Sequence, residues 1–403
     1  MSDACVTNPP KNEIEEKEIE VKTGILLGTI AVLLSSSVAL ADITIGVNLS
    51  TTGPAASLGI PEKNALALVP KAIGGEKIKL VVYDDASDTT TAVQNVKRLV
   101  SENNVDLILG PSTTPTSLAV VDVAAESKTP MLSVASASAI VSPVDAKRKW
   151  VFKVTANDDI YAQAMVAHMV KKGVKTVGVI AVDDPYGEAN TKEYMKLAQK
   201  HGIKTLSIEK FKKTDTSVTA QVLKLMGGKP DAMFIVAVGT PAALPQTALV
   251  DRGYKGKIYQ TGGAANADFI RVGGKAVEGT FLPASPVLVA EQLPNGYPTK
   301  EEALKFAKAY EGKFGPRSTF ASHIWDAFKV LETAVPKALK AGKPGTPQFR
   351  NALRTAIEGT KGIKGAGAVF NLSTTDHSGV NQLGMAVLRV ENGKWKLEDH
   401  AAF

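Results

Sequence analysis

The chain has 403 residues, a formal net charge of +7 at pH 7 and a single cysteine. A chain of this length is too long for one hydrophobic core, so we expect two lobes. Its basic residues are scattered and are not interleaved with aromatic residues, which argues against a nucleic-acid partner.

The first predicted element is a cleavable export signal. Gly24 to Leu34 is an apolar run of 11 residues, whereas a membrane-spanning helix needs about 20. Ser35-Ser36-Ser37 ends the run, and Ala39-Leu40-Ala41 supplies the small residues of a signal-peptidase site. We therefore expect residues 1–41 to be a signal peptide and the mature chain to begin at Asp42.

The start of this leader does not fit an ordinary signal, because residues 11–20 are acidic where a basic segment is expected. A start at Val21 would leave Lys22 ahead of the apolar run, so residues 1–20 are interpreted as a start-site error or an extension. Removing the leader, with three lysines and six carboxylates, would raise the net charge from +7 to +10. This mildly favours anionic solutes.

The cysteine count bears on the compartment. Cys5 lies in the leader, so the mature chain would have no disulfide and no thiolate chemistry. No cysteine follows the apolar run to carry a lipid anchor. We therefore expect an unanchored protein of the Gram-negative periplasm, with secretion as the alternative.

Strands and helices alternate in two runs after the leader. In the first run we predict strands at 43–47, 78–83, 105–109, 130–134 and 151–154, with helices at 92–99 and 117–126. In the second run we predict strands at 177–182, 203–209, 232–238 and 257–260, with helices at 160–171, 189–200 and 216–226. Further helices are predicted at 298–313, 321–341 and 347–357, and final strands at 384–390 and 394–397. Such alternation is typical of parallel sheets with crossover helices, so the predicted fold class is α/β with two doubly wound lobes.

Segments with small, hydroxyl or acidic residues follow five of these strands. They lie at 110–115, 135–138, 183–188, 239–241 and 261–263. In open α/β sheets, ligands bind at the carboxyl ends of strands. The first segment directly precedes a helix, where hydroxyls and free amides form an anion-binding site. Any single segment could be an ordinary helix cap, but five together, from both runs, predict a binding cleft.

Sequence signatures of catalysis are missing. There is no phosphate-binding loop, dinucleotide fingerprint or nucleophile elbow. The histidines form no metal-binding pair; they are His168, His201, His323, His377 and His400. His323, on an apolar helix, is expected to be a packed histidine. We therefore expect no catalytic residue, no metal and no cofactor.

Together these segments resemble the periplasmic branched-chain amino-acid-binding (Leu/Ile/Val-binding) family, the solute receptors of ABC importers. The resemblance covers nearly all of residues 42–400. It is carried by Ser50–Gly59, Tyr83–Asp88, Gly110–Thr114, Tyr186–Glu188 and Gly274–Gly279. It implies a type I periplasmic-binding-protein fold, in which two Rossmann-like lobes are joined by a hinge of three crossovers. The implied lobes are residues 42–157 plus 284–382 and residues 158–283 plus 383–403.

The resemblance also implies which positions bind the ligand. The hydroxyl residues at 112–114 would bind a carboxylate, those at 135–138 would add donors, position 58 would contact the apolar end of the ligand, and a tyrosine would close over it from the second lobe. These residues are Leu58, Ser112, Thr113, Thr114, Ala135, Ser136, Ser138 and Tyr186.

Two positions depart from the family pattern. Thr240 replaces an aromatic residue, and Gly262 replaces the acid that pairs with the ligand's ammonium. Because an unpaired buried ammonium costs several kcal/mol, we expect a carboxylate without an α-amino group: an aromatic carboxylate or an aryl or branched oxo acid. The smaller side chains would also leave room for a ring, and the local sequence resembles the aromatic-carboxylate subgroup. Alternatively, Asp183, Asp184 or Glu188 pairs with an ammonium, and the ligand is an amino acid.

The expected function is therefore capture of a small carboxylate by hinge closure, followed by docking on the membrane permease of an ABC importer. We expect a monomer. An enzyme in the same cleft is disfavoured by the missing motifs. A sensor that presents its closed form to a membrane receptor needs the same closure, and the sequence does not separate it from a transport receptor. A regulator of the LacI kind shares the fold but needs an N-terminal DNA-binding helix-turn-helix.

Overall fold

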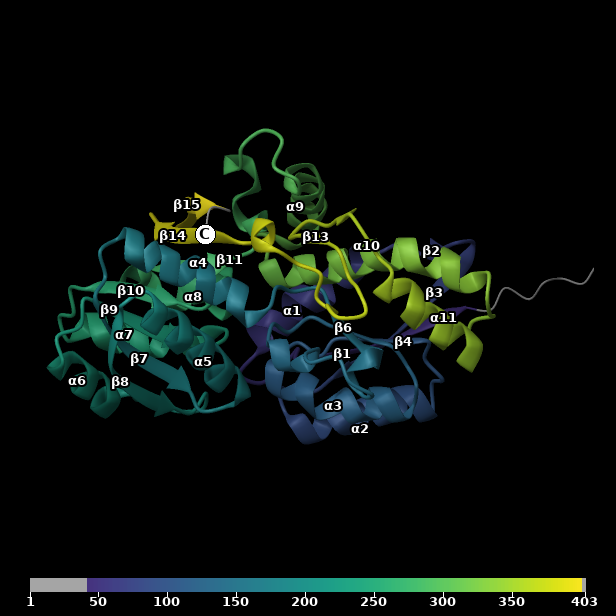
Figure 1. Cartoon of the computed structure of the whole chain (residues 1–403), viewed down its shortest axis with the longest axis horizontal. Coiled ribbons are helices and arrows are strands. Elements are labelled where there is room, and N and C mark those ends of the chain that lie inside the picture. The colour runs from purple at the N-terminus through teal and green to yellow at the C-terminus, as the bar shows by residue number, and fades with distance from the viewer. Residues whose placement is uncertain (1–41, 401–403) are drawn as a thin grey trace, which may run out of the picture. The chain divides into compact units, whose positions relative to one another are not determined.

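The computed structural model describes residues 42–400 (Figure 1), so the predicted export signal lies outside the described residues. Six strands form a first sheet in the order β2-β3-β1-β4-β5-β6. All neighbours are parallel except β2, which is antiparallel to β3. The strands are β1 (Ile43–Leu49), β2 (Ala72–Ile73), β3 (Glu76–Asp84), β4 (Leu107–Leu109), β5 (Met131–Ser133) and β6 (Val151–Lys153).

Helices cover both faces of this sheet. Two of them pack together on one face, and three pack on the opposite face (Figure 1). The first pair is α2 (Thr89–Ser101) and α3 (Thr114–Glu126); the other three are α1 (Ala56–Ala65), α10 (Thr319–Leu339) and α11 (Pro347–Glu358). Side-chain caps fix where several begin: Asp88 accepts the Thr91 amide hydrogen at the start of α2, and Ser318 caps α10.

Seven strands form a second sheet in the order β15-β14-β11-β10-β9-β7-β8. The five that come first in sequence are parallel, whereas β14 and β15 add an antiparallel edge. The strands are β7 (Thr176–Val182), β8 (Lys204–Phe211), β9 (Ala232–Val236), β10 (Lys257–Gln260), β11 (Phe281–Ala284), β14 (Ala386–Glu391) and β15 (Lys394–His400). Strand β9 is buried over its whole length, as expected when helices cover both faces of a parallel sheet.

The helices of the second sheet divide in the same way. Two pack together on one face, and by the right-handed crossover rule the next three lie on the other face. The pair is α4 (Asp158–Lys171) and α5 (Pro185–Lys200), and the three are α6 (Thr219–Gly227), α7 (Ala243–Asp251) and α8 (Ala267–Gly273). Two further elements are α9 (Lys300–Phe314) and a small hairpin of β12 (Ile363–Lys364) and β13 (Val369–Phe370).

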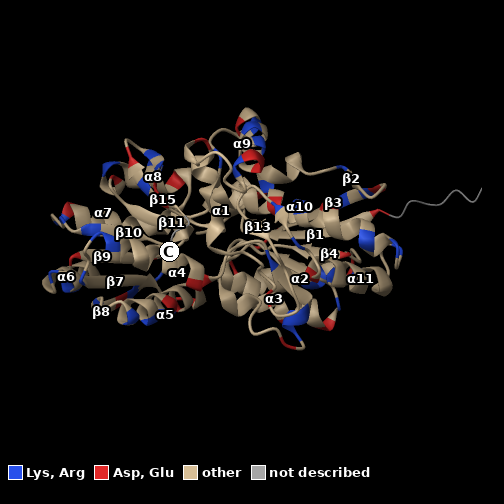
Figure 2. Ribbon diagram, turned by 45° about the horizontal axis from the view of Figure 1, so that its top comes forward, with Lys and Arg blue, Asp and Glu red and all other residues tan. Residues whose placement is uncertain are grey.

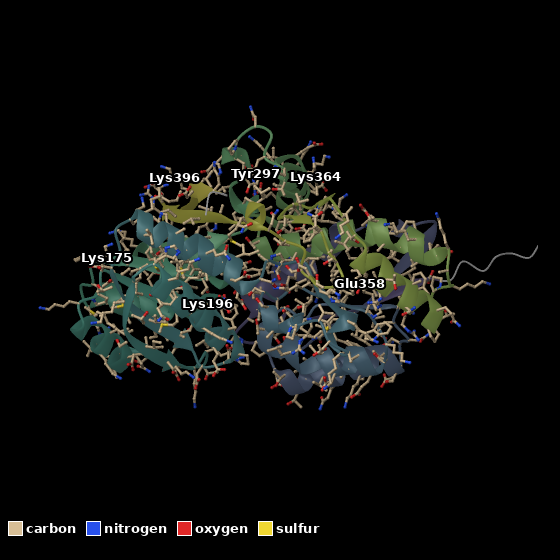
Figure 3. All side chains as sticks on the ribbon, in the orientation of Figure 1. Lys175, Lys196, Tyr297, Glu358, Lys364 and Lys396 are labelled. Carbon is tan, nitrogen blue, oxygen red and sulfur yellow. The ribbon has the colours of Figure 1, made fainter. Side chains whose placement is uncertain are left out.

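The chain passes between the two sheets three times: after β6, after β11 and before β14. Tyr297 ties two of these passages together, because its hydroxyl donates to the Leu383 carbonyl at 2.7 Å (Figure 3). The predicted α/β class with two doubly wound, mainly parallel sheets is confirmed. The residue limits of the two lobes stay a prediction.

In the view of Figure 2, Lys and Arg residues are interspersed with Asp and Glu residues over the helices around both sheets. Among residues 42–400, no helix is long and apolar enough to cross a bilayer.

One predicted loop is shorter than expected. Residues 50–59 were predicted to form a loop, but α1 already begins at Ala56. Gly59 makes this possible, because the helix lies directly against the backbone that follows β1. A Cβ at Gly59 would lie 2.1 Å from the Ser50 carbonyl oxygen. The small residues in this segment therefore serve close packing of helix against loop.

We predict that Gly59→Ala destabilises the protein by about 1–3 kcal/mol, because the added methyl group forces backbone apart in a packed region. Alanine is the better helix former by up to about 1 kcal/mol, so propensity alone predicts the opposite sign. Gly312→Ala in α9 is the matched control, since its Cβ would meet no atom within 4 Å. Urea unfolding of both variants checks this; equal stabilisation by both would contradict it.

Candidate functional site

A pocket lies where the carboxyl ends of the two sheets face each other. Both sheets contribute to its walls: the segments after β4 and β5 come from the first sheet, and those after β9 and β10 from the second. The structure brings eight of the ten predicted positions together here, namely Leu58, Ser112, Thr113, Thr114, Ala135, Ser136, Tyr186 and Gly262.

Two predicted residues do not line this pocket. The Ser138 amide donates to Asp158 Oδ2 at 2.9 Å, and Ser138 Oγ accepts from the Asp158 amide at 3.2 Å. Ser138 therefore joins the loop after β5 to the start of α4. Thr240 begins the short 3₁₀ helix Thr240–Ala242, beside the pocket.

The start of α3 forms one wall of the pocket. Gly110 has φ +95°, and a Cβ there would lie 2.2 Å from the Asn48 carbonyl oxygen, so only glycine fits this approach. Thr113 caps α3 by accepting the Thr116 amide hydrogen. The Thr114 hydroxyl is buried, and it has no hydrogen-bond partner among the described residues. A helix start with an unpartnered hydroxyl attracts an anion.

A buried acid lies behind Ser112. Ser112 Oγ accepts the Ser50 amide hydrogen at 2.9 Å and makes a second, short hydrogen bond with Glu62 Oε2. Glu62 is fully buried in α1, and it makes no ion pair within the described part of the chain. Burial raises the pKa of Glu62 well above its ordinary value; the Ser112 hydrogen bond opposes this rise, and the nearby charge of Asp85 adds to it.

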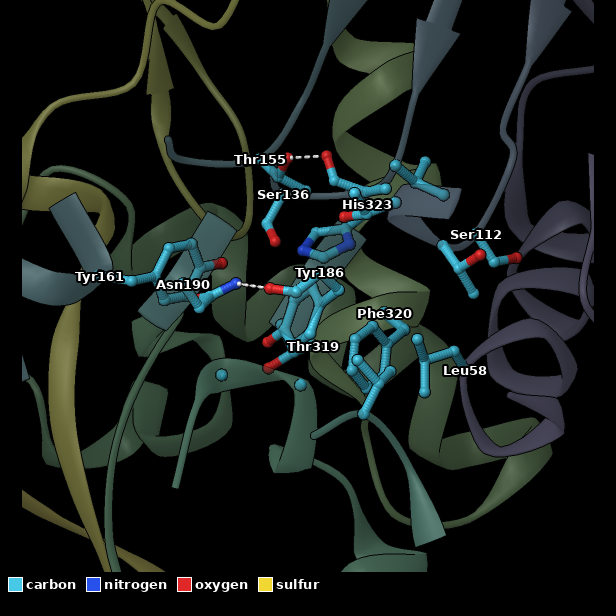
Figure 4. A pocket seen from close by; sticks show the side chains of 17 residues that line it. Leu58, Ser112, Ser136, Thr155, Tyr161, Tyr186, Asn190, Thr319, Phe320 and His323 are labelled. Carbon is cyan, nitrogen blue, oxygen red and sulfur yellow. Dashed lines mark hydrogen bonds between the residues drawn. The ribbon is translucent and has the colours of Figure 1, made fainter. Parts of the chain in front are cut away.

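The loop after β5 presents its polar groups to the pocket in a fixed way. Thr155 Oγ1 donates to the Ala135 carbonyl at 2.6 Å, and Lys153 Nζ donates to the carbonyls of Ser136 and Ala156. These hydrogen bonds fix the loop from the side away from the pocket, and the Ser136 hydroxyl points into the pocket (Figure 4). Lys153 is fully buried, and burial lowers the pKa of its ammonium to about 8.

Aromatic and aliphatic side chains form the rest of the walls. Leu58 and Phe320 lie side by side, and Tyr186 lies between them and Asn190 (Figure 4). Asn190 Nδ2 donates to the Tyr186 carbonyl at 3.1 Å, which fixes the first turn of α5. Burial raises the pKa of the Tyr161 and Tyr186 hydroxyls, so both stay protonated.

The space beside Gly262 differs from the expectation. The sequence suggested that glycine here enlarges the pocket, but Tyr161 occupies the space. A Cβ on Gly262 would lie 2.5 Å from Tyr161 Cε1 and 3.0 Å from the Pro283 carbonyl oxygen. Gly262 is therefore needed to seat the Tyr161 ring, and an acidic side chain would not fit with this tyrosine in place.

Asp183, Asp184 and Glu188, which could pair with a ligand ammonium in place of an acid at position 262, do not line the pocket. Asp183, just before α5, and Glu188, in its first turn, lie 2.8 and 3.5 Å from the Lys210 ammonium, and both side chains are exposed. Asp184 accepts the amide hydrogens of Tyr186 and Gly187 at 2.9 and 3.1 Å, so it caps the helix. The pocket lining, all within the described residues, thus offers hydroxyls and amides and no carboxylate.

Sequence reasoning missed the contribution of α10. Thr319, Phe320 and His323 come from its first turns and line the pocket. His323 was expected to be an ordinary packed histidine. Burial lowers its pKa to about 3, so its ring is neutral, and Nδ1 is buried without a partner in the part of the chain that the structure describes. No motif marks these residues, because their role depends on α10 reaching the cleft.

The remaining missed residues are Val134, Thr155, Tyr161, Asn190, Val238 and Gly263. A signal was available for two of them, since Val238 and Gly263 belong to or adjoin predicted strand-end segments. Across residues 42–400, no cluster of three or more histidine, cysteine or acidic side chains is arranged to hold a metal ion.

Comparison with known proteins agrees with this architecture. The sequence profile of the family described as "Periplasmic binding protein" matches residues 42–394. Leu/Ile/Val-binding protein homolog 3 of Brucella melitensis is 26% identical over 329 residues, covering 77% of this chain and 86% of the relative.

Solved structures extend the comparison. An extracellular ligand-binding receptor from Rhodopseudomonas palustris HaA2 is 44% identical with a TM-score of 0.85, covering 89% of this chain and 99% of that one. An ABC-transporter solute-binding protein from R. palustris, solved in complex with benzoate, shares the fold at 19% identity and a TM-score of 0.78, covering 90% and 97%. Both the relatives and the fold are those of solute-binding receptors rather than enzymes, and the chain belongs to the periplasmic binding protein family.

Proposed function

We propose that this protein is the extracytoplasmic receptor of an ABC importer and captures a small organic carboxylate that carries an aromatic or branched apolar group and no ammonium. The observation that carries the proposal is the pocket lining: a helix start with the unpartnered Thr114 hydroxyl, apolar and aromatic walls, and no carboxylate. The receptor would work as a monomer in the periplasm.

The walls indicate how the two ends of such a ligand are held. The start of α3 and the Ser136 hydroxyl supply hydrogen-bond donors for a carboxylate, and charge-assisted hydrogen bonds of this kind are the strong ones. Leu58, Phe320 and the tyrosines supply an apolar surface for a ring or a branched chain. Because both sheets contribute walls, ligand binding favours the closed arrangement of the lobes.

Glu62 prepares Ser112 for an anion. A serine oxygen can accept two hydrogen bonds and donate one. If Glu62 is protonated, it donates to Ser112 Oγ, which also accepts from the Ser50 amide, and the Ser112 hydrogen is free to point at the ligand. If Glu62 were ionised, it would take that hydrogen and add a negative charge beside the ligand carboxylate. Its raised pKa favours the protonated form.

The alternative is a receptor for leucine, isoleucine or valine, which the names of the curated relatives favour. It requires a counter-charge for the ammonium, since leaving a charge unpaired in a closed cleft costs several kcal/mol. No acid of the described residues lines the pocket to supply it. A ligand sensor for a membrane receptor remains an alternative use of the same closure.

We predict that aryl or oxo carboxylates stabilise the protein and that amino acids do not. Mature protein, unfolded and refolded to remove bound ligand, would be heated with benzoate, hydroxybenzoates, benzoylformate or aliphatic oxo acids. Leucine, isoleucine, valine and phenylalanine form the comparison set. A ligand at a hundred times its Kd should stabilise by about 2.7 kcal/mol, which a thermal-shift assay detects. Stabilisation by amino acids alone would refute the proposal.

We predict that Glu62→Gln keeps wild-type affinity for the tightest of these acids at pH 6, because its amide hydrogen replaces the donated proton. In the wild type, affinity should be constant below the pKa of Glu62 and fall as the pH rises above it, since binding then requires proton uptake. The variant should lack this fall. Calorimetric titration between pH 6 and 9 measures both.

Ser112→Ala is the companion variant. It should weaken binding about tenfold or more at pH values below the pKa of Glu62, where the Ser112 hydrogen is free to point at the ligand, since it removes a hydrogen bond to a charged group. A tenfold loss in Glu62→Gln at pH 6 would instead mean that Glu62 acts in its ionised form, and would contradict the role assigned to it.

A further inference from the structure

The two lobes also touch each other beside the ligand pocket. Gly239 follows β9, and a Cβ there would lie 2.7 Å from Ser57 Oγ and 3.4 Å from the Pro54 carbonyl oxygen, which belong to the start of α1 and the loop before it. Neither Gly239 nor Ser57 lines the pocket. The closed arrangement therefore includes a contact between the lobes that involves no ligand atom.

A lysine crosses the same gap. Lys213, in the segment after β8, is half-buried, and its Nζ donates to the Ser87 carbonyl at 3.3 Å. Ser87 follows β3 of the first sheet, whereas β8 is an edge strand of the second sheet. The hydrogen bond therefore joins the two lobes directly. Lys213 does not line the ligand pocket.

The acceptor on the first lobe is held in place. The Ser87 amide donates to Asp85 Oδ1 at 2.9 Å, and the Ser87 hydroxyl donates to the Thr52 carbonyl at 2.9 Å. The same hydroxyl accepts the Ala55 amide hydrogen at 3.0 Å. Only the lysine side chain has to be ordered when the bond between the lobes forms, which lowers the entropic cost of making it.

Two acids lie near the ammonium, one on each side of the gap. Asp88 caps α2; backbone and side-chain hydrogen bonds at the start of that helix lower its pKa, and the charge of Lys213 lowers it further. Asp184 caps α5; burial raises its pKa, while backbone hydrogen bonds and the charge of Lys213 oppose the rise. Since Tyr186 in the first turn of α5 lines the pocket, attraction at this point favours closure over the ligand.

Resting on the proposed receptor function, we infer that Lys213 is a latch that holds the lobes closed over a bound ligand without touching it. The Lys213–Ser87 bond and the Ser57–Gly239 contact join the two lobes, so they form only when the lobes meet. They therefore add the same free energy to the binding of every ligand that the closed form encloses. Because they break when the lobes open, they slow release rather than capture.

Lys213→Met tests the latch on the full mature protein. Surface plasmon resonance gives the affinity and the release rate, with benzoate, benzoylformate and leucine as probes. For each probe that binds, we expect about fivefold weaker binding through faster release, the value of a half-exposed hydrogen bond from a charged donor. The difference from the wild type should shrink in about 1 M salt, where charges are screened within about 3 Å.

Two further lysine variants serve as controls. Lys212→Met changes the exposed neighbour, which does not line the pocket, and should bind each probe as the wild type does. Lys213→Arg keeps the positive charge and the hydrogen-bond donors, so it should restore most of the affinity. An unchanged affinity in Lys213→Met overturns the inference. A loss that differs between probes also overturns it, because Lys213 would then act on the ligand itself.

The Ser57–Gly239 contact offers an independent pair of variants. Ser57→Leu places a larger side chain where Gly239 has to approach, so it should weaken binding of every probe about tenfold or more. Ser57→Ala keeps the approach and removes a buried hydroxyl that has no partner among the described residues, so it should bind as the wild type does. Equal thermal stability of the two ligand-free variants shows that both are folded. Wild-type affinity in Ser57→Leu overturns the inference, because the lobes then need not meet here.

The choice of probes separates this inference from the proposed function. Binding of the aryl acids with no effect of Lys213→Met supports the proposed function and overturns the latch. Binding of leucine alone, weakened by Lys213→Met, refutes the proposed ligand class and supports the latch. If none of the three probes binds, the proposed function fails, and the latch fails with it.

Discussion

The pocket depends on the start of α3, where the Thr114 hydroxyl is buried at the pocket wall without a protein partner in the described chain. An anion placed there gains charge-assisted hydrogen bonds and the favourable end of the helix dipole, and no mobile cationic side chain has to be ordered. The close approach of Gly110 to Asn48 fixes where this helix begins. The remaining, mainly apolar walls contact the rest of the ligand only when its charged group is held at this point.

Behind that helix start lies a buried polar network that has no cation. Asp85 accepts from Asn48 and Ser50 at 2.8 and 2.6 Å, and the Ser50 amide in turn donates to Ser112. Glu62 is the member with fewest partners, since its Oε1 has none among the described residues. Ionising both acids beside a bound carboxylate would place three negative charges in a region of low polarity. The lower-energy arrangement keeps Glu62 neutral, which couples ligand charge to a proton.

The sequence predicted the parts of the site that follow from local rules. Residues after parallel strands lie at one edge of a sheet, and this located the segment from Ser112 to Thr114, Ala135 and Ser136. It could not locate His323 or Phe320, because they belong to a helix some 200 residues away in sequence whose packing alone brings it to the cleft. The glycine at 262 was predicted to open space, yet its neighbour in space, Tyr161, fills it. Which side chain fills a vacated volume is a property of packing rather than of local pattern.

The absence of charged side chains from the described pocket lining favours a ligand with a single charge over a zwitterion. Burial keeps His323 neutral, and the tyrosines stay protonated. Lys153 donates its hydrogen bonds to the carbonyls of Ser136 and Ala156. A zwitterion would bring one charge that the start of α3 can solvate and an ammonium for which the described lining offers no carboxylate. A carboxylate with an apolar body brings only the first. Its hydrocarbon part would replace water on walls drawn from both sheets, so the free energy of burial is released only when the lobes are closed.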